Sequence, residues 1–249
     1  MAIKISLITV VFNNQNFIAQ CIESVLAQNY PNVENIVVDG ASKDGTPSII
    51  EKYRSRIAKF ISEPDKGIYD AMNKGIRLAT GDVVGILNSD DFFPAHDVLT
   101  KVAAAFENNE CDCLYGDLFY VDRINTQKII RKWRAGNYQS GLFEKGWMPP
   151  HPTFYVKKPF FDKAGFYDLD FPLAADYELM LRFLEKNKLK PFYLSECLVH
   201  MRWGGTSNRL SHLLKNYREN KKAWTKNGLK IKFYTLFLKR FRKLAQFIS

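Results

Sequence analysis

The chain of 249 residues is 46% hydrophobic and 25% charged, which excludes a wholly disordered protein and is sufficient for one large α/β domain. No apolar run reaches the roughly 18 residues of a membrane-spanning helix, and no signal peptide precedes the first predicted strand, so we expect a cytoplasmic protein. Of the 36 basic and 26 acidic residues behind the net charge of +10, eleven basic residues and one acid lie within 215–249. The body is therefore neutral, which argues against a nucleic-acid partner and indicates a separate role for the tail.

The first hundred residues alternate predicted strands with predicted helices. Apolar, β-branched segments predict the strands, and apolar residues at helical spacing predict the helices between them. The strands are expected at 3–11, 33–38, 60–61 and 83–87, and the helices at 17–26, from 46, at 68–78 and from 96. Asn13 or Asn14 is expected to cap the first helix. This alternation predicts parallel βαβ units with right-handed crossovers.

After residue 112 the pattern changes. The expected elements are paired strands at 114–121 and 128–133, a loop at 136–152, a helix at 174–185, a strand at 192–200 and helices after Arg209. The predicted fold class is α/β, with a Rossmann-like, mostly parallel sheet flanked by helices and a C-terminal helical tail.

Two adjacent carboxylates follow the predicted strand 83–87 almost directly. Asp90 and Asp91 therefore lie at the carboxyl end of a strand, where open α/β sheets bind their ligands. Neighbouring carboxylates repel each other unless they share a cation, and a divalent ion such as Mg²⁺ or Mn²⁺ is the simplest occupant. The alternative is that the pair caps the helix predicted near His96.

A further carboxylate, Asp39, ends the predicted strand 33–38. Gly40 and Gly45 follow it and allow the backbone to turn close to a ligand. An acid at this point can accept hydrogen bonds from a ribose hydroxyl or a base N–H. Neither a P-loop nor a dinucleotide fingerprint is present.

Four segments occur in a set order, at 9–14, 39–46, 67–82 and 87–91. Together they resemble the family 2 glycosyltransferases, the inverting sugar-nucleotide transferases of the GT-A fold. The resemblance covers most of residues 3–210 and is strongest over 3–95. It implies a nucleotide-sugar donor, a UDP-sugar on family frequency, and a divalent cation, Mn²⁺ or Mg²⁺.

The resemblance also implies roles for individual residues. Phe12 takes the position of the aromatic ring, usually Tyr, that stacks on uracil, and Asp39 matches the acid that holds the base or ribose. Asp91 is expected to coordinate the metal directly, with Asp90 beside it. Asn88 replaces the first acid of the commoner Asp-Ser-Asp-Asp motif, which should weaken metal binding. The positions implied to contact the nucleotide also include Thr9, Val11, Asn13, Asn73, Ser89 and Asp90.

In the second half, residues 174–179 resemble the acidic motif whose Asp deprotonates the acceptor hydroxyl. Asp176 is therefore the expected catalytic base. Ala175 departs from the Glu that often precedes this residue, and Glu178 is the fallback. The alternative for Asp176 is a helix cap.

Two further residues are expected to contact the acceptor or the diphosphate. His151 matches a His-containing segment of related polysaccharide transferases, although a role in anchoring its loop is about as well supported. Arg202, within the glycine-containing segment 199–207, offers a forked donor to a diphosphate, and this segment is often a mobile loop in the family.

The expected organisation is one GT-A domain over 1–210, with a nucleotide-sugar half over about 1–95 and an acceptor half over about 96–210. Residues 211–249 form a basic amphipathic tail. Its aromatic residues share one stripe of a helix and its basic residues fall mostly opposite, a pattern that suits an anionic bilayer. We expect residues 228–249 to hold the protein on the cytoplasmic face of the inner membrane; the alternative is packing on the body or on a second subunit.

The resulting expectation is a metal-dependent, inverting, hexosyltransferase-type enzyme that adds a sugar to a hydroxyl of a glycan. The acceptor is expected to be lipid-linked, in cell-surface polysaccharide biosynthesis, and the sequence leaves a homodimer open. The alternatives are a nucleotidyltransferase and a degenerate nucleotide-sugar-binding module in which Asn88 and Ala175 mark lost catalysis.

Overall fold

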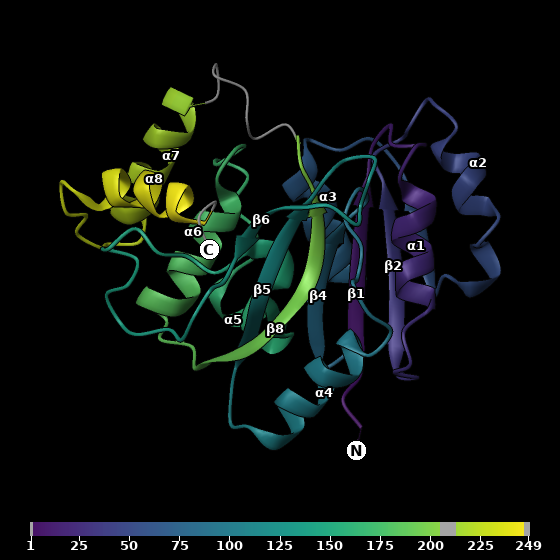
Figure 1. The fold of residues 1–249 in the computed structure, drawn as a ribbon, viewed down its shortest axis with the longest axis horizontal. Coiled ribbons are helices and arrows are strands. Elements are labelled where there is room, and N and C mark those ends of the chain that lie inside the picture. The colour runs from purple at the N-terminus through teal and green to yellow at the C-terminus, as the bar shows by residue number, and fades with distance from the viewer. Residues whose placement is uncertain (1, 205–212, 247–249) are drawn as a thin grey trace.

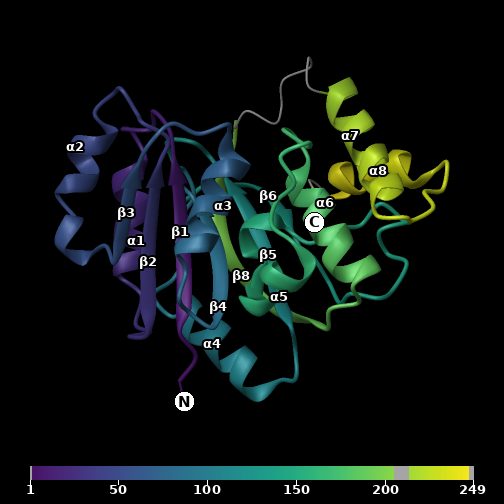
Figure 2. The ribbon, with the colours of Figure 1, turned by 180° about the vertical axis from the view of Figure 1, so that it is seen from behind.

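A computed structural model describes residues 2–204 and 213–246 of the chain. One sheet of eight strands runs through the molecule in the order β3-β2-β1-β4-β7-β5-β6, and β8 pairs with β5. Helices cover both faces of this sheet (Figures 1 and 2). The predicted α/β class is confirmed. The boundary predicted at residue 210 lies outside the described residues.

The first four strands are parallel and adjacent, as predicted. They are β1 (Ile5–Val11), β2 (Val33–Asp39), β3 (Lys59–Ser62) and β4 (Val83–Asn88), linked by α1 (Ile18–Leu26), α2 (Thr46–Glu51), a 3₁₀ helix (Arg54–Arg56) and α3 (Ile68–Leu78). β2 and β3 follow on one side of β1, whereas β4 pairs with its other side. The strand order therefore reverses between β1 and β4, and open α/β sheets bind ligands at such a point.

The second half of the chain extends the same sheet. Its elements are α4 (Val98–Asn108), β5 (Cys113–Val121), β6 (Ile129–Trp133), a 3₁₀ turn (His151–Thr153), β7 (Tyr155–Lys157), α5 (Pro159–Ala164), α6 (Ala175–Leu181) with a π turn (Arg182–Lys186), β8 (Pro191–Arg202), α7 (Leu213–Lys226) and α8 (Thr235–Ala245). β7 is antiparallel to β4 and β5, and so joins the two halves. β6 is antiparallel and β8 parallel to β5.

The side chains of β1 alternate between two apolar cores. Ile8 and Val10 pack with α3 and α6, whereas Ile5 and Leu7 pack with α1 and α4. Because helices cover both faces, the whole strand is buried.

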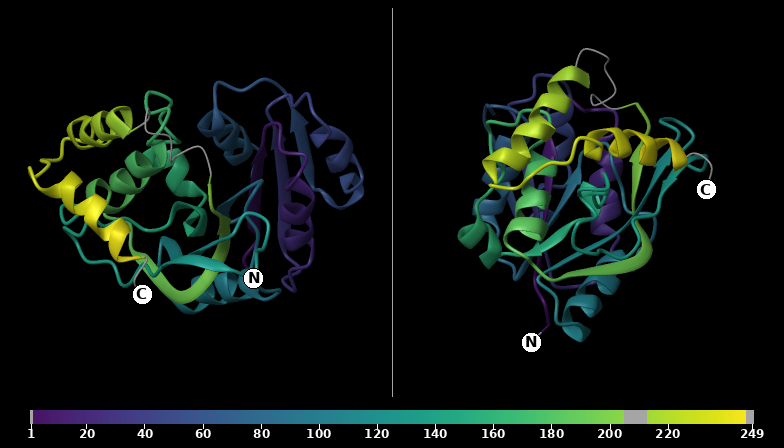
Figure 3. Two further views of the ribbon diagram at one scale, coloured as in Figure 1. Left: turned by 45° about the horizontal axis from the view of Figure 1, so that its top comes forward. Right: turned by 90° about the vertical axis from the view of Figure 1, so that its left-hand side faces the viewer.

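The predicted tail packs on the body in part. Trp224 of α7 is buried, and its indole N–H donates to the Tyr177 hydroxyl of α6 at 2.8 Å. In α8, the Thr235 hydroxyl donates to the Glu144 carbonyl at 2.7 Å. Figure 3 shows both helices beside α6.

A glycine sets the distance between α8 and the loop beneath it. Gly146 has φ +73°, and a Cβ there would lie 2.3 Å from the Lys239 backbone nitrogen. Only glycine allows this approach of the two backbones.

The aromatic stripe of the tail does not take part in this packing. Phe233, Phe237 and Phe241 are 96%, 62% and 52% exposed. Among the described residues, no helix has the length and apolar content to cross a bilayer.

Candidate functional site

The ends of β1, β2 and β4 meet at one edge of the sheet. Val11 is paired with Asp39 in the β1–β2 register, and Val10 is paired with Asn88 in the β1–β4 register. The segments that follow these strands therefore leave the sheet side by side. They include Phe12 and Asp90, two residues with predicted roles.

An exposed aromatic ring lies at the end of β1. Phe12 is 64% exposed, and a Cβ on Gly40 would lie 3.3 Å from its ring and 2.7 Å from Asp65 Oδ2. A ring face, a bare backbone and a carboxylate thus converge at one point. Asp65 also forms an ion pair with Lys74 at 2.6 Å. Asp65 has no predicted role; the signal that could have identified it is an acid shortly after the carboxyl end of β3.

The Asp39 carboxylate is fully buried and fixes the loop that begins at Gly40. It accepts hydrogen bonds from the Ser42 backbone N–H at 3.1 Å and the Ser62 hydroxyl at 2.6 Å. Asn13, in the left-handed region at φ +47°, joins the same loop: its N–H donates to Ser42 Oγ at 2.7 Å. These bonds hold the loop against the end of β1.

Three of the implied nucleotide contacts have side chains turned into the protein. Thr9 and Val11 are buried in the sheet, so a ligand can meet only their backbone. The buried Asn73 amide donates to the Tyr167 carbonyl at 2.8 Å and accepts from the Tyr167 N–H at 2.9 Å. We therefore assign Asn73 a structural role.

A hydrogen bond to Ser89 connects the segments that follow β1 and β4. Its hydroxyl accepts a hydrogen bond from the Asn14 side chain at 2.8 Å. Helix α1 begins later, at Ile18, and has no side-chain cap. The predicted capping role of Asn13 or Asn14 is therefore wrong, because the Asn14 amide bridges the two strand ends.

The two adjacent acids lie in different environments. Asp91 is fully buried, whereas Asp90 is part-exposed. Burial and the Asp90 charge raise the pKa of Asp91 well above its ordinary value. Asn88 Nδ2 donates to Asp91 Oδ2 at 3.2 Å. Helix α4 begins only at Val98, so the acids do not cap it.

Two buried oxygens at the end of β4 have no hydrogen-bond partner among the described residues: Asn88 Oδ1 and Asp91 Oδ1. With the Asp90 carboxylate they form a set of hard oxygen donors. Within the described part of the chain, no three His, Cys, Asp or Glu residues cluster as metal ligands. The set therefore fits a Mg²⁺ or Mn²⁺ ion that takes its remaining ligands from substrate phosphates and water.

Arg202 brings a cation to the acid pair from the end of β8. Its guanidinium donates to the Asp90 carbonyl and to Gln20 Oε1, and it lies 4.6 Å from the Phe17 ring centroid. Burial lowers the pKa of Arg202, while the carboxylates of Asp90 and Asp91 raise it. Residues 205–207 of the segment predicted to bind diphosphate lie outside the described residues.

A cavity of about 330 Å³ opens beside this edge of the sheet. Four predicted positions line it: Asn88, His151, Asp176 and Arg202. Helices α3, α6, α7 and α8 and strands β5 and β6 also contribute residues to its walls. The structure thus brings residues of both halves to one cavity, whereas Phe12, Asp39, Asp90 and Asp91 are not among its lining residues.

The Asp176 carboxylate faces this cavity from the first turn of α6. The residue before the helix is Ala174, and no side chain caps it, so Asp176 is not a cap. The Tyr69 hydroxyl donates to Asp176 Oδ1 at 3.1 Å. Burial and the charge of Asp176 raise the pKa of Tyr69 well above its ordinary value, which keeps this donor protonated. The fallback, Glu178, is buried in an ion pair with Arg182 at 2.9 Å.

A pair of stacked tyrosines links His151 to Asp176. Tyr167 stacks on Tyr69 with ring centroids 5.5 Å apart, and its hydroxyl lies 2.6 Å from His151 Nε2. Burial lowers the pKa of His151, so its ring is neutral near pH 7. Neither tyrosine has a predicted role: Tyr69 lies within the segment 67–82, where nothing in the sequence sets it apart from a core aromatic, and Tyr167 lies outside the predicted motifs.

The chain is similar to known proteins over most of its length. The family model described as "Glycosyl transferase family 2" matches residues 6–167. An uncharacterized glycosyltransferase of Mycobacterium tuberculosis is 34% identical over 188 residues, which cover 72% of this chain and 68% of the relative. A "PGL/p-HBAD biosynthesis glycosyltransferase" of Mycobacterium bovis is 28% identical over 210 residues, covering 82% and 79%.

Solved structures share the fold. S. aureus TarS 1-349 in complex with UDP-GlcNAc superimposes with a TM-score of 0.72 at 17% identity, covering 97% of this chain and 73% of that one. The mannosyltransferase PcManGT from Pyrobaculum calidifontis, in complex with GDP-Man and Mn²⁺, gives 0.65 at 20% identity, covering 99% and 71%.

Proposed function

The chain belongs to glycosyl transferase family 2, and from this premise we propose that it moves a sugar from a UDP-sugar to a hydroxyl of a lipid-linked glycan in cell-surface polysaccharide synthesis. The observation that carries the proposal is the cavity in which Asp176 faces the end of β4 and Arg202. Family membership decides against the nucleotidyltransferase alternative. Nucleotide sugars bound to TarS and PcManGT support the donor class.

The nucleoside binds at the ends of β1 and β2 in this proposal. The exposed Phe12 ring offers a stacking face, and Gly40 leaves room for close approach of the base. The Asp39-ordered loop holds Gly40 in place, and Asp65 provides a carboxylate for a base N–H.

The diphosphate then lies at the end of β4. Asp91 and Asp90 would hold a divalent ion there, and when bound it offsets the charge of the leaving nucleoside diphosphate. Arg202 adds a fixed positive charge beside the acids.

Asp176 acts as the base. As the acceptor oxygen bonds to the anomeric carbon, the bond from that carbon to the diphosphate oxygen breaks, and the hydroxyl proton passes to Asp176. Attack from the face opposite the diphosphate inverts the configuration. The bond from Tyr69 to Oδ1 orients the carboxylate and leaves Oδ2 for the proton.

A thermal-shift panel of UDP-, GDP- and dTDP-sugars, each with and without Mn²⁺, tests the donor. A ligand at 100 times its Kd stabilises the native state by about 2.7 kcal/mol, so we expect the melting temperature to rise by about 5 °C or more with a UDP-sugar and Mn²⁺. Phe12→Ala should remove most of this shift. A panel in which no nucleotide sugar shifts the transition would contradict the proposal.

The exposed aromatic stripe supports contact with an anionic membrane. Phe233, Phe237 and Phe241 lie on the surface, close in sequence to the exposed Lys232 and Arg240. Aromatic rings beside cations suit the interface of such a bilayer.

Vesicle flotation tests this contact. The protein is expected to float with phosphatidylglycerol vesicles, and Phe237→Ser with Phe241→Ser is expected to reduce the bound fraction at least about fivefold. Ile124→Ser, at another exposed apolar residue, is the control. Equal flotation of the double variant and wild type would overturn the membrane contact.

A further inference from the structure

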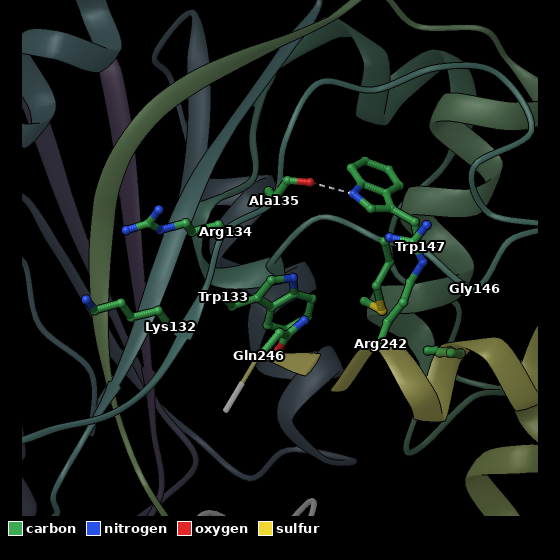
Figure 4. Close-up of a pocket in the computed structure, with 10 residues that line it drawn as sticks. Lys132, Trp133, Arg134, Ala135, Gly146, Trp147, Arg242 and Gln246 are labelled. Atoms are coloured by element: carbon green, nitrogen blue, oxygen red, sulfur yellow. Dashed lines mark hydrogen bonds between the residues drawn. The ribbon is translucent and has the colours of Figure 1, made fainter. Parts of the chain in front are cut away.

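A second cavity, of about 250 Å³, lies between β6 and α8 (Figure 4). Trp133, Trp147 and Met148 give it apolar walls, and Lys239 and Arg242 of α8 bring two cations to it. In Figure 4, Arg242 extends from α8 toward Trp147, whereas Lys132 of β6 and Arg134, just beyond the end of β6, point away. None of its described lining residues is acidic.

The walls of this cavity are fixed by hydrogen bonds. The Trp147 indole N–H donates to the Ala135 carbonyl at 2.7 Å, and Arg242 Nε donates to the Lys145 carbonyl at 3.0 Å. The close approach of Gly146 to the α8 backbone holds the helix over the opening. The cavity is therefore a formed feature of the fold.

This cavity adjoins the one that contains Asp176. Trp133, Met148 and Lys239 line both. The Lys239 ammonium donates to Asn220 Oδ1 at 3.0 Å and lies 3.5 Å from the centroid of the Tyr177 ring, next in sequence to Asp176. A molecule bound in the second cavity would therefore lie next to the part of the Asp176 cavity where the acceptor is proposed to bind.

We propose that the second cavity binds the phosphate-bearing end of the acceptor's lipid carrier, an isoprenyl diphosphate. This inference rests on the proposed function and names the acceptor class of the same site. Arg242 and Lys239 supply charge for the phosphates, and the two tryptophans with Met148 supply apolar contact for the adjoining lipid. Helix α8 presents Phe237 and Phe241 on its exposed surface, which gives the rest of the lipid a membrane-facing side.

Membrane headgroups carry the same kind of phosphate as a lipid carrier, but the walls that this cavity shares with the Asp176 cavity favour the acceptor. A phospholipid headgroup would need no connection to the base. An isoprenyl diphosphate with an attached glycan needs this connection, because the sugar must reach Asp176 while the diphosphate remains bound.

Calorimetric titration of the full chain with farnesyl diphosphate tests the inference, with farnesol, inorganic diphosphate and phosphatidylglycerol vesicles as comparison probes. We expect farnesyl diphosphate to bind at least about tenfold more tightly than farnesol or inorganic diphosphate. Farnesyl diphosphate alone can place its phosphates on the two cations and its lipid chain on the apolar walls. Lys239→Gln with Arg242→Gln should weaken it at least about tenfold. Lys230→Gln with Arg240→Gln removes the same charge from exposed tail positions and should leave it unchanged.

A second measurement is needed because the double variant could lose affinity by weakening the packing of α8 instead of by removing the two charges. Farnesyl diphosphate is expected to change the tryptophan fluorescence of wild type, and Trp133→Phe should remove most of the change while preserving the melting temperature. Equal affinity of the two double variants, or binding of vesicles but not farnesyl diphosphate, would overturn the inference. Neither result touches the proposed function, which fails instead if no nucleotide sugar binds.

Discussion

Replacing Asp176 by Asn is expected to lower kcat for sugar transfer by about 100- to 10,000-fold, the usual contribution of a general base. The amide keeps the size of the carboxylate and an oxygen that can accept the Tyr69 bond, so the cavity should persist. What it loses is the capacity to take the acceptor proton. Single-turnover transfer of a radiolabelled sugar measures the effect, and the affinity for the donor should change less than about threefold.

Two neighbouring substitutions separate proton transfer from structure. Glu178→Gln, in the same helix, breaks the buried ion pair with Arg182 and should lower the melting temperature while kcat stays near that of wild type. Tyr69→Phe removes the bond to Asp176 alone and should lower kcat by only about tenfold. Turnover by Asp176→Asn at the wild-type rate would remove the mechanism and favour a base elsewhere.

The fold follows from sequence wherever the apolar pattern is clear. The predicted strand 83–87 agrees with β4 because its apolar run is continuous, and the predicted helix 68–78 agrees with α3 because its apolar residues recur at helical spacing. The strand β7 was missed because three residues are too few to show a pattern, and α5 was missed because its six residues make fewer than two helical turns. The position of β7 is set by pairing with β4 and β5, a contact between segments distant in sequence.

The candidate site was predictable where its functional residues are adjacent in the sequence. Asp90 and Asp91 at a strand end indicate a ligand site on their own, and the cavity places Asp176 near that strand end. The role of Asn73 was not predictable, because its partner is the backbone of Tyr167 far along the chain. The same holds for Tyr69, whose function depends on α6 packing next to α3.

Helix α8 of the tail packs on the body with one side and exposes aromatic residues on the other. Its aromatic stripe predicts a membrane contact, with packing on the body as the alternative. In the structure, Thr235 bonds to the Glu144 carbonyl and Lys239 lies over the Tyr177 ring, while Phe237 remains exposed. The close packing depends on Gly146, whose importance appears only when α8 is placed over it.

Replacing Asp91 by Asn is expected to abolish the Mn²⁺-dependent part of the thermal shift caused by a UDP-sugar, and to lower kcat/KM at least about 100-fold. The same change should raise the melting temperature of the ligand-free protein by about 2 to 4 °C, equivalent to about 1 kcal/mol. Because burial and Asp90 raise the pKa of Asp91 in the folded state, its ionised form costs stability at neutral pH. A neutral amide removes this cost, and its oxygen can still accept from Asn88.

Asp90→Asn is the matched comparison, since it removes one charge from the same pair at a part-exposed position. It should weaken the Mn²⁺ effect without abolishing it, because the unpartnered buried oxygen belongs to Asp91. Titration with Mn²⁺ in the presence of UDP distinguishes the two variants without any turnover. If Asp91→Asn retains the full Mn²⁺ effect, or if its ligand-free form melts below wild type, then the buried carboxylate stabilises the fold and the metal ligand lies elsewhere. A gain in ligand-free stability together with loss of the Mn²⁺ effect would show that the carboxylate is kept for the reaction at the expense of the fold.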